Sequence, residues 1–219
     1  MIANDIIVEN IPPLKVTDTG EKALIWMKEF GVDHLPVIDD LQFVGLVSED
    51  DILDINRPDE PFKDYHFSYQ RPYVPSSAHI YEVVKLAVEL HLSLIPVVQN
   101  EKYIGTITLE SLIQNIAKVT GANDPGGIIK LEIEENNYSL SEIARIVESN
   151  DANILSTYVL GNSESKNIQV TLKVSISDLS HILATFERFN YTVIATFQES
   201  EYFEHLKERY DSFMKYLNI

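Results

Sequence analysis

Residues 11–53, IPPLKVTDTGEKALIWMKEFGVDHLPVIDDLQFVGLVSEDDIL, decide the fold, because residues 71–113, RPYVPSSAHIYEVVKLAVELHLSLIPVVQNEKYIGTITLESLI, repeat their pattern without a gap. The offset between the copies is 60 residues. Few positions are identical, among them Pro36/Pro96 and Gly45/Gly105, but the apolar and polar positions agree throughout. Internal repeats of this size indicate units that bury their apolar faces against one another, so the two copies are expected to pack as a pair.

The pattern predicts the same elements, in the order β-α-β-β-α, in each copy. In the first copy, helical spacing of apolar residues predicts a helix over about 20–30. A strand over 35–38, a polar turn and a strand over 43–47 follow, and a second helix begins at Ser48. Because proline cannot donate a ladder hydrogen bond, Pro36 predicts either an edge strand or a strand that starts at the proline.

This order of motifs resembles the CBS domain. The pattern apolar-Pro-Val-apolar, a turn, then apolar-Gly-apolar-apolar-[ST]-x-x-[DE] occurs at 35–53 and in looser form at 95–113. The resemblance covers about residues 1–120 and implies two tandem modules, residues 1–60 and 61–120, that pack as the usual pair.

The resemblance also implies a nucleotide-binding role for Ser48 and Asp51 at the start of the last helix of the first copy. Asp51 would accept hydrogen bonds from ribose hydroxyls, and Ser48 would meet the phosphate or ribose. The same S-x-x-[DE] pattern is a capping box, in which the two side chains satisfy the free N–H groups of the helix start. The two roles are compatible. In the second copy Thr108 keeps the hydroxyl, but Ser111 stands where the carboxylate is expected, so the second site is predicted to be the weaker.

The other walls of the predicted sites come from residues that lead into the proline strands. By resemblance, adenine would lie between Ile11-Pro12 and Val32-Asp33-His34 in the first copy. The matching residues of the second copy include Arg71 and Ser93. His34 and Arg71 are candidates for a phosphate contact, although a half-buried histidine is more often satisfied by the backbone. Because basic residues are scarce here, adenosine, AMP or an adenosyl compound is expected rather than ATP.

The second half of the chain changes pattern after a turn-rich hinge at residues 121–127. Residues 128–198 read as β-α-β-β-α-β, the ferredoxin-like order, and resemble an ACT domain. The whole chain is thus similar to CBS–ACT proteins of the acetoin-utilisation-regulator type. The turn at 135–139, ENNYS, lacks the Pro and Gly of amino-acid-binding ACT domains, which speaks against an amino-acid ligand. Residues 199–219 carry apolar residues at steps of 3, 4, 3 and 4 and are predicted to form a C-terminal helix, docked on its own domain or used as a dimer contact.

Composition narrows the function class. The formal charge is −17, which disfavours binding to nucleic acid or to an anionic membrane. The absence of cysteine excludes disulfides and thiolate chemistry. No signal peptide, membrane-spanning run, phosphate-binding loop, nucleophile elbow or zinc-binding helix motif is found, so no catalytic or metal residue is assigned and a cytoplasmic location is expected.

The sequence therefore predicts an α+β regulatory protein without enzymatic activity. Its CBS pair would sense an adenine-containing ligand such as AMP, ADP or ATP, with no cofactor required. A homodimer would relay the signal to an unidentified partner enzyme or transporter. The alternative is a constitutive scaffold whose ligand sites have degenerated, as the residue at position 111 and the turn at 135–139 would suggest.

Overall fold

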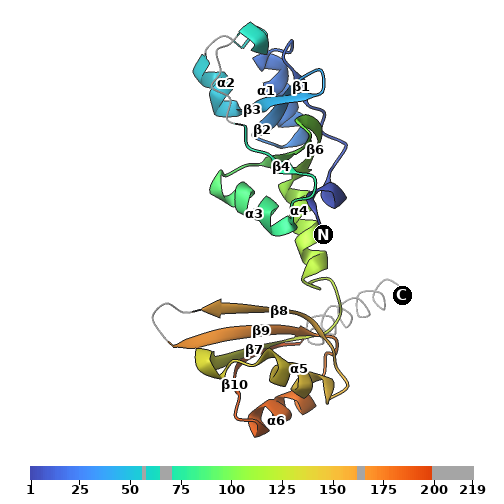
Figure 1. The fold of residues 1–219 in the computed structure, drawn as a ribbon, viewed down its shortest axis with the longest axis vertical. Coiled ribbons are helices and arrows are strands. Elements are labelled where there is room, and N and C mark those ends of the chain that lie inside the picture. Colours follow the sequence, from blue (N-terminus) through green and yellow to red (C-terminus); the bar gives the residue numbers. More distant parts are fainter. Residues whose placement is uncertain (56–57, 65–70, 162–165, 199–219) are drawn as a thin grey trace, which may run out of the picture. The chain divides into compact units, whose positions relative to one another are not determined.

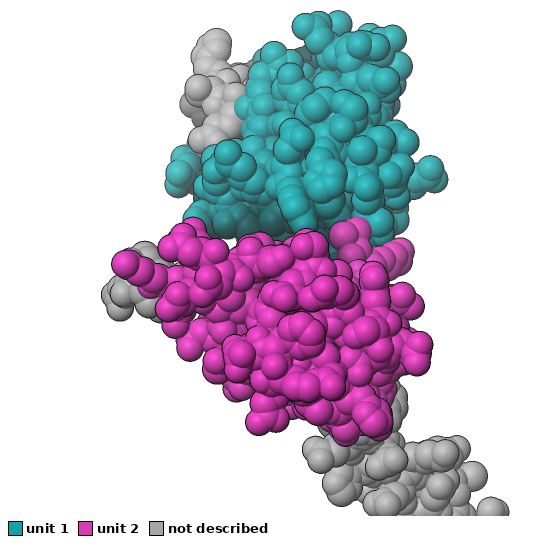
Figure 2. Space-filling model, turned by 60° about the horizontal axis from the view of Figure 1, so that its bottom comes forward, with its two compact units in different colours: residues 1–116 teal, residues 117–219 magenta. Residues whose placement is uncertain are grey.

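The computed structural model describes residues 1–55, 58–64, 71–161 and 166–198. The chain divides into two compact units, residues 1–116 and 117–219, which Figure 2 colours separately. The predicted C-terminal helix at 199–219 lies outside the described residues.

The first unit contains both copies of the repeat, and each copy has the predicted element order (Figure 1). The first copy comprises β1 (Leu14–Lys15), α1 (Gly20–Phe30), β2 (His34–Asp39), β3 (Gln42–Ser48) and α2 (Glu49–Ile55). The second comprises β4 (Val74–Pro75), α3 (Ile80–Glu89), β5 (Leu94–Gln99), β6 (Lys102–Thr108) and α4 (Leu109–Val119). Short 3-10 turns lie at Ala3–Ile6 and Phe62–Asp64.

The strands of both copies form one six-stranded sheet in the order β1-β2-β3-β6-β5-β4. Within each copy a tight antiparallel hairpin, β2–β3 or β5–β6, pairs along its length. The two hairpins are joined at the single pair Gln42↔Lys102. The mixed α+β class predicted from sequence is confirmed.

Both alternatives predicted for the proline strands, an edge position or a start at the proline, are wrong, since β2 begins at His34 and β5 at Leu94. β2 and β5 each lie second from the edge, because the two-residue strands β1 and β4 pair with them in parallel. That pairing begins at Val37 and Val97, one residue after each proline. Because β1 and β4 are so short, no edge ladder requires the missing N–H group of Pro36 or Pro96.

A single hydrophobic core joins the two copies. α1 contributes Ala23 and Met27, and α3 contributes Val83 and Ala87, as their helical spacing requires. They pack on strand residues that are fully buried, such as Leu35 and its counterpart Ile95. Burial of each such aliphatic side chain contributes about 1.5–3 kcal/mol to stability. Because side chains of both copies form the core, neither copy has a complete core alone.

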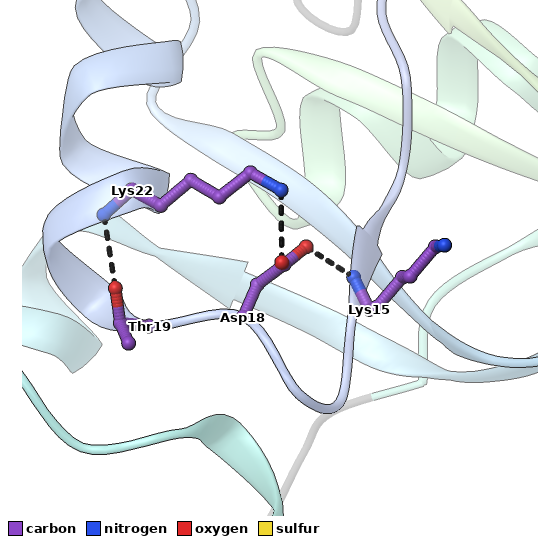
Figure 3. A network of polar contacts seen from close by, with 4 residues as sticks. All are labelled: Lys15, Asp18, Thr19 and Lys22. Carbon is purple, nitrogen blue, oxygen red and sulfur yellow. Dashed lines mark hydrogen bonds and ion pairs between the residues drawn. The ribbon is translucent and has the colours of Figure 1, made fainter.

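A polar network fixes the start of α1, and Figure 3 shows its four residues. Asp18 accepts a hydrogen bond from the Lys15 amide at 2.8 Å and from Lys22 Nζ at 2.8 Å. Thr19 caps the helix by accepting from the Lys22 amide at 3.4 Å. The network closes the turn between β1 and α1 and so sets the direction in which the helix leaves the sheet.

The second unit has the predicted β-α-β-β-α-β order (Figure 1). Its elements are β7 (Gly127–Glu134), a 3-10 turn (Glu135–Asn137), α5 (Leu140–Glu148), β8 (Ile154–Gly161), β9 (Asn167–Val174), α6 (Ser180–Arg188) and β10 (Thr192–Phe197). The strand order β10-β7-β9-β8 is antiparallel throughout and is that of a ferredoxin-like sheet. α5 and α6 bury their apolar faces against alternate residues of β7 and β9.

Candidate functional site

The two copies meet at the residues that precede β2 and β5. The Asp33 amide donates to Ser93 Oγ at 2.9 Å, and the Ser93 amide donates to His34 Nδ1 at 3.4 Å. Ser93 Oγ also lies 3.0 Å from His34 Nδ1. Because Nδ1 accepts a backbone N–H, this geometry assigns the ring proton of neutral His34 to Nε2.

Burial lowers the pKa of His34 below its ordinary value of 6.5, although the carboxylates of Asp33, Asp51 and Asp50 act in the opposite direction. The neutral ring is also the form that the contact requires, since a protonated Nδ1 cannot accept the Ser93 amide. His34 therefore joins the two copies as a neutral side chain. The sequence favours a backbone carbonyl as the partner of a half-buried histidine, whereas the partners of Nδ1 here are the amide and the hydroxyl of Ser93.

Ser48 and Asp51 form the capping box at the start of α2. Asp51 Oδ2 accepts from the Ser48 amide at 2.8 Å and from the Ser48 hydroxyl at 2.6 Å. Ser48 Oγ accepts in return from the Asp51 amide at 3.1 Å. One oxygen of the predicted ribose-binding carboxylate is therefore already engaged by its own helix.

At the start of α4, Thr108 and Ser111 make different hydrogen bonds from those of Ser48 and Asp51. Thr108 Oγ1 accepts from the Ser111 amide at 3.1 Å, which is the capping half of the motif. The Ser111 hydroxyl donates to the Ile6 carbonyl at 3.0 Å, in the N-terminal segment of the chain. The Ser111 hydroxyl is thus tied to a residue 105 positions away and not to its own helix.

A cavity of about 480 Å³, the Thr108 cavity, lies between the copies. The first copy and the segment before it contribute Val8, Asn10, Ile11, Phe30, Gly31, Val32 and Asp33. The second copy contributes Ser93, Thr108, Leu109, Glu110, Ser111 and Gln114. Five of the predicted site residues (Ile11, Val32, Asp33, Ser93 and Thr108) thus share one cavity.

A second cavity of about 370 Å³, the Ser48 cavity, is related to the first by the repeat. It is lined by Asp33, His34, Ser48, Glu49, Asp50, Leu90 and His91. Six lining positions of the two cavities match at the 60-residue offset: Phe30/Leu90, Gly31/His91, Ser93/Asp33, Thr108/Ser48, Leu109/Glu49 and Glu110/Asp50. The repeat therefore builds two related sites, one that combines apolar and polar side chains and one with three carboxylates among its lining residues.

The grouping of site residues differs from that expected from sequence. The sequence analysis combined residues of the same copy, Ile11 and Val32 with Ser48 and Asp51. In the structure Ile11 and Val32 lie with Thr108 of the other copy. The physical reason is the contact of Asp33 and Ser93, which places the end of the first helix of each copy beside the start of the second helix of the other.

Three predicted residues, Asp51, Pro12 and Arg71, are not among the lining residues of either cavity. Pro12 is solvent-exposed. The guanidinium of Arg71 donates to the Phe43 carbonyl on β3, and Phe43 in turn makes an edge-to-face contact with Tyr73. Arg71 holds the start of the second copy against the first.

Sequence reasoning missed several cavity residues, among them Val8, Phe30 and Gln114. In the sequence Phe30 is one of several apolar residues at helical spacing over 20–30, and Gln114 resembles any solvated helix position. The signal that could have found them is the 60-residue offset, used to combine the helix end of one copy with the helix start of the other.

An apolar groove of about 460 Å³ runs between α3 and α4 beside the Thr108 cavity. Its walls are mainly aliphatic: Val84, Ala87, Val88, Leu92, Leu109, Leu112, Ile113 and Ile116. Val88 and Ile113 are each 66% exposed. Asp33, Ser93 and Leu109 line both the groove and the Thr108 cavity, so the two surfaces share a wall.

The second unit has its own cavity of about 600 Å³ near the turn at 135–139. It is lined by Glu132, Ile133, Glu134, Asn137, Glu142, Asn167, Phe189, Asn190, Tyr191 and Thr192. The Tyr191 hydroxyl donates to Glu142 Oε2 at 2.9 Å, and burial together with this bond raises the pKa of Tyr191 to about 12. The described lining has three carboxylates and no lysine or arginine, so the carboxylate of an amino acid would find no cation there.

Within the described residues, no group of three or more His, Asp or Glu side chains is arranged to hold a metal ion. Across the same residues, no helix combines the length and the apolar character needed to cross a membrane.

Comparison with known proteins identifies the domain family of the two copies. The model of the CBS domain matches residues 3–57 and 64–118, about half of the chain. Similar solved structures include a CBS domain pair/ACT domain protein from Thermotoga maritima, with 19% identity and a TM-score of 0.47 over 54% of this chain and 98% of that one. A protein from Vibrio cholerae described as an acetoin utilization protein gives 19% identity and 0.48 over 56% of this chain and 96% of that one. CBSX2, solved in complex with AMP, gives 25% identity and 0.46 over 54% of this chain and 97% of that one.

Proposed function

Since the chain belongs to the CBS domain family, we propose that it is a regulatory protein that binds an adenine-containing ligand in the Thr108 cavity. The observation that carries the proposal is the composition of that cavity, whose walls come from both copies. A ligand held there contacts Ile11 and Val32 on one side and Thr108 on the other. Its binding free energy therefore depends on how the two copies are arranged.

The walls of the Thr108 cavity suit a planar heterocycle joined to a polar group. Val8, Ile11, Phe30 and Val32 supply apolar surface for a base, while Thr108 and the amides of Asn10 and Gln114 supply polar groups. The volume of about 480 Å³ lies within the roughly 300–1,000 Å³ usual for small-molecule sites. The Ser48 cavity is smaller and has three carboxylates among its seven lining residues, so we place the ligand in the Thr108 cavity first.

The charge of the cavity selects among adenine compounds. Asp33 and Glu110 are the charged side chains among its described lining residues, and both are acidic. The chain as a whole carries −17. A polyphosphate would be repelled at close range without a cation to offset it, so adenosine or a cationic adenosyl compound binds best, AMP less well and ATP least.

Regulation requires that the ligand favour one of two states. The shared wall of Asp33, Ser93 and Leu109 joins the Thr108 cavity to the apolar groove of α3 and α4. We assign that groove to a second copy of the chain. Exposed aliphatic side chains such as Val88 and Ile113 form the kind of apolar patch that becomes buried at the centre of a protein–protein interface. The homodimer would then relay ligand binding to a partner enzyme or transporter, with no catalytic step in this chain.

The test is a titration of the full chain with adenosine, AMP, ATP and S-adenosylmethionine by calorimetry, with thermal unfolding in parallel. A ligand at 100 times its dissociation constant adds about 2.7 kcal/mol to the unfolding free energy. We expect adenosine or S-adenosylmethionine to bind and ATP to bind at least tenfold more weakly. No shift with any of the four supports the constitutive scaffold instead.

A matched pair of variants locates the site. Gln114→Trp places an indole into the Thr108 cavity from an exposed position on α4 and should weaken binding at least tenfold. Asp54→Trp makes the same change 60 residues earlier on α2, at the matching position, and should leave binding within twofold. If Asp54→Trp weakens binding and Gln114→Trp does not, the ligand binds beside Ser48 and Asp51 and not in the Thr108 cavity.

A further inference from the structure

The N-terminal segment, residues 1–8, precedes the first copy in sequence but is bonded to the second. The Ala3 and Asn4 amides donate to the carbonyls of Ala78 and Ser76 at 2.8 and 3.0 Å. The Val8 amide donates to the Thr106 carbonyl on β6 at 2.8 Å. The segment thus crosses from one copy to the other before the chain enters the first copy.

Apolar contacts reinforce this docking. Ala3 and Ile6 are buried, at 0% and 2% exposure. Ile7 packs directly on Gly105 of β6, at a position where any Cβ would collide with Ile7 Cγ2. The segment is therefore part of the packed structure of the second copy.

Ser111 connects this segment to the Thr108 cavity. Its hydroxyl donates to the Ile6 carbonyl at 3.0 Å, while its amide donates to Thr108 Oγ1 at 3.1 Å. Ser111 lines the cavity, and so does Val8, two residues after Ile6. A displacement of the segment would move the Val8 wall of the cavity.

The first copy shows why a hydroxyl is needed here. Its matching residue, Asp51, is a carboxylate, which only accepts hydrogen bonds and is held by Ser48. A carboxylate at position 111 would face the Ile6 carbonyl with two acceptors and no proton between them. Serine supplies the proton, so the departure from the carboxylate pattern at 111 allows a long-range contact that Asp51 makes with none of the described residues.

We infer that Ser111 is a positioning residue that fixes the N-terminal segment as a wall of the Thr108 cavity, so that docking of the segment and ligand binding stabilise each other. The coupling to ligand rests on the proposed function, whereas the docking role of Ser111 does not. By reciprocity, a ligand that needs the docked segment protects it, and undocking lowers the apparent affinity in proportion to the fraction of chains that remain docked.

The docking role is tested by hydrogen exchange of the Asn4 and Val8 amides in the full chain without ligand. Ser111→Ala removes one hydrogen bond and should raise their exchange rates roughly threefold to tenfold. Ser111→Thr keeps the hydroxyl and should restore slow exchange. Ser149→Ala is the matched control, because Ser149 also donates its hydroxyl to an isoleucine carbonyl (Ile146, 2.9 Å) but lies in the second unit. Unchanged exchange in Ser111→Ala, or equal acceleration in Ser149→Ala, overturns the inference.

The coupling is tested with saturating adenosine. In the wild-type chain saturating adenosine should slow exchange at Val8, because opening of the segment would then require release of the ligand. If bound adenosine leaves exchange at Val8 unchanged, the coupling is wrong. If adenosine does not bind the wild-type chain, the proposed ligand is wrong, and the exchange rates without ligand still decide the role of Ser111.

Discussion

The starts of α2 and α4 are the same motif used in two ways. At the start of α2, Ser48 and Asp51 satisfy each other, and among the described residues their side-chain bonds stay within four residues. At the start of α4, Thr108 keeps the cap but Ser111 turns its hydroxyl to Ile6, more than a hundred residues away. One substitution of carboxylate by hydroxyl converts a local contact into a long-range one.

The same difference extends to the cavities beside these helices. The Ser48 cavity has the carboxylates of Asp33, Glu49 and Asp50 in its lining, and the Thr108 cavity is lined by apolar and uncharged polar side chains with two acids. The repeat therefore conserves geometry between the copies while the side chains assign different ligand chemistry to each. Three experiments sharpen this comparison.

The largest effect is expected at Gly105, where the N-terminal segment meets β6. Gly105→Ala adds a Cβ that collides with Ile7. It also places alanine at a backbone φ of 156°, which residues with a side chain rarely adopt. Overpacking of this kind costs about 1–3 kcal/mol of unfolding free energy, measured by denaturant titration. Gly161→Ala is the control, because its Cβ meets nothing within 4 Å, and should change stability by less than about 0.5 kcal/mol.

A double-variant cycle identifies the cause of the Gly105→Ala effect. In an Ile7→Ala background the loss should shrink, since the colliding Cγ2 is gone, although the backbone strain remains. An undiminished loss would show that Ile7 does not dock against Gly105 and would weaken the contrast between the copies.

A smaller effect is expected at Asp51, which acts only within its own helix. Asp51→Ala leaves the Ser48 amide without its acceptor and should lower the unfolding free energy by about 1 kcal/mol, the usual value of a cap. Exchange at the Val8 amide should not respond, in contrast to Ser111→Ala. Asp54→Ala removes the same charge near the other end of α2 and should cause no loss. A response at Val8 would mean that the two helix starts are coupled.

The smallest effect is a pH dependence confined to the first copy. His34 has a folded pKa below its ordinary 6.5, so the unfolded chain binds the proton more readily. The stability that neutral His34 contributes is complete above pH 6.5 and is lost as pH falls through the lowered pKa. The second copy has Leu94 at the matching position and contributes no such term.

The pH dependence is measured as the difference in unfolding free energy between the wild-type chain and His34→Gln from pH 8 to pH 5. The wild-type chain should lose more stability than the variant over this range. Parallel curves would mean that protonation of His34 is compatible with its contact to Ser93 and that the junction is not pH-sensitive.

Much of the fold was predictable because it depends on local pattern. The helical stripe over 20–30, the hairpin that follows it and the cap at Ser48 all rest on contacts between residues close in sequence. The β-α-β-β-α-β order of the second half was predictable for the same reason. The place of the proline strands was predicted wrongly, because the sequence indicates a first strand in each copy but not that β1 or β4 pairs along the outer side of the proline strand.

The candidate site was predictable in its members but not in its grouping. Ile11, Val32, Asp33, Ser93 and Thr108 were all named from sequence, yet as parts of two sites within separate copies. Nothing in a gapless repeat says which copy supplies each wall, since the alignment is the same for either pairing. The contact of Asp33 with Ser93, 60 residues apart, decides the pairing.

The sequence by itself determined the repeat, its elements and the residue types that each copy offers to a ligand, because periodicity and capping act over a few residues. Only the tertiary structure decided that the copies exchange walls and that residue 111 contacts the start of the chain. The physical reason is that a hydrogen bond such as Ser111 to Ile6 depends on where two distant backbones meet. Compared with Asp51, a serine at position 111 therefore suggests the loss of a ligand-binding residue, whereas in the folded chain its hydroxyl contacts Ile6.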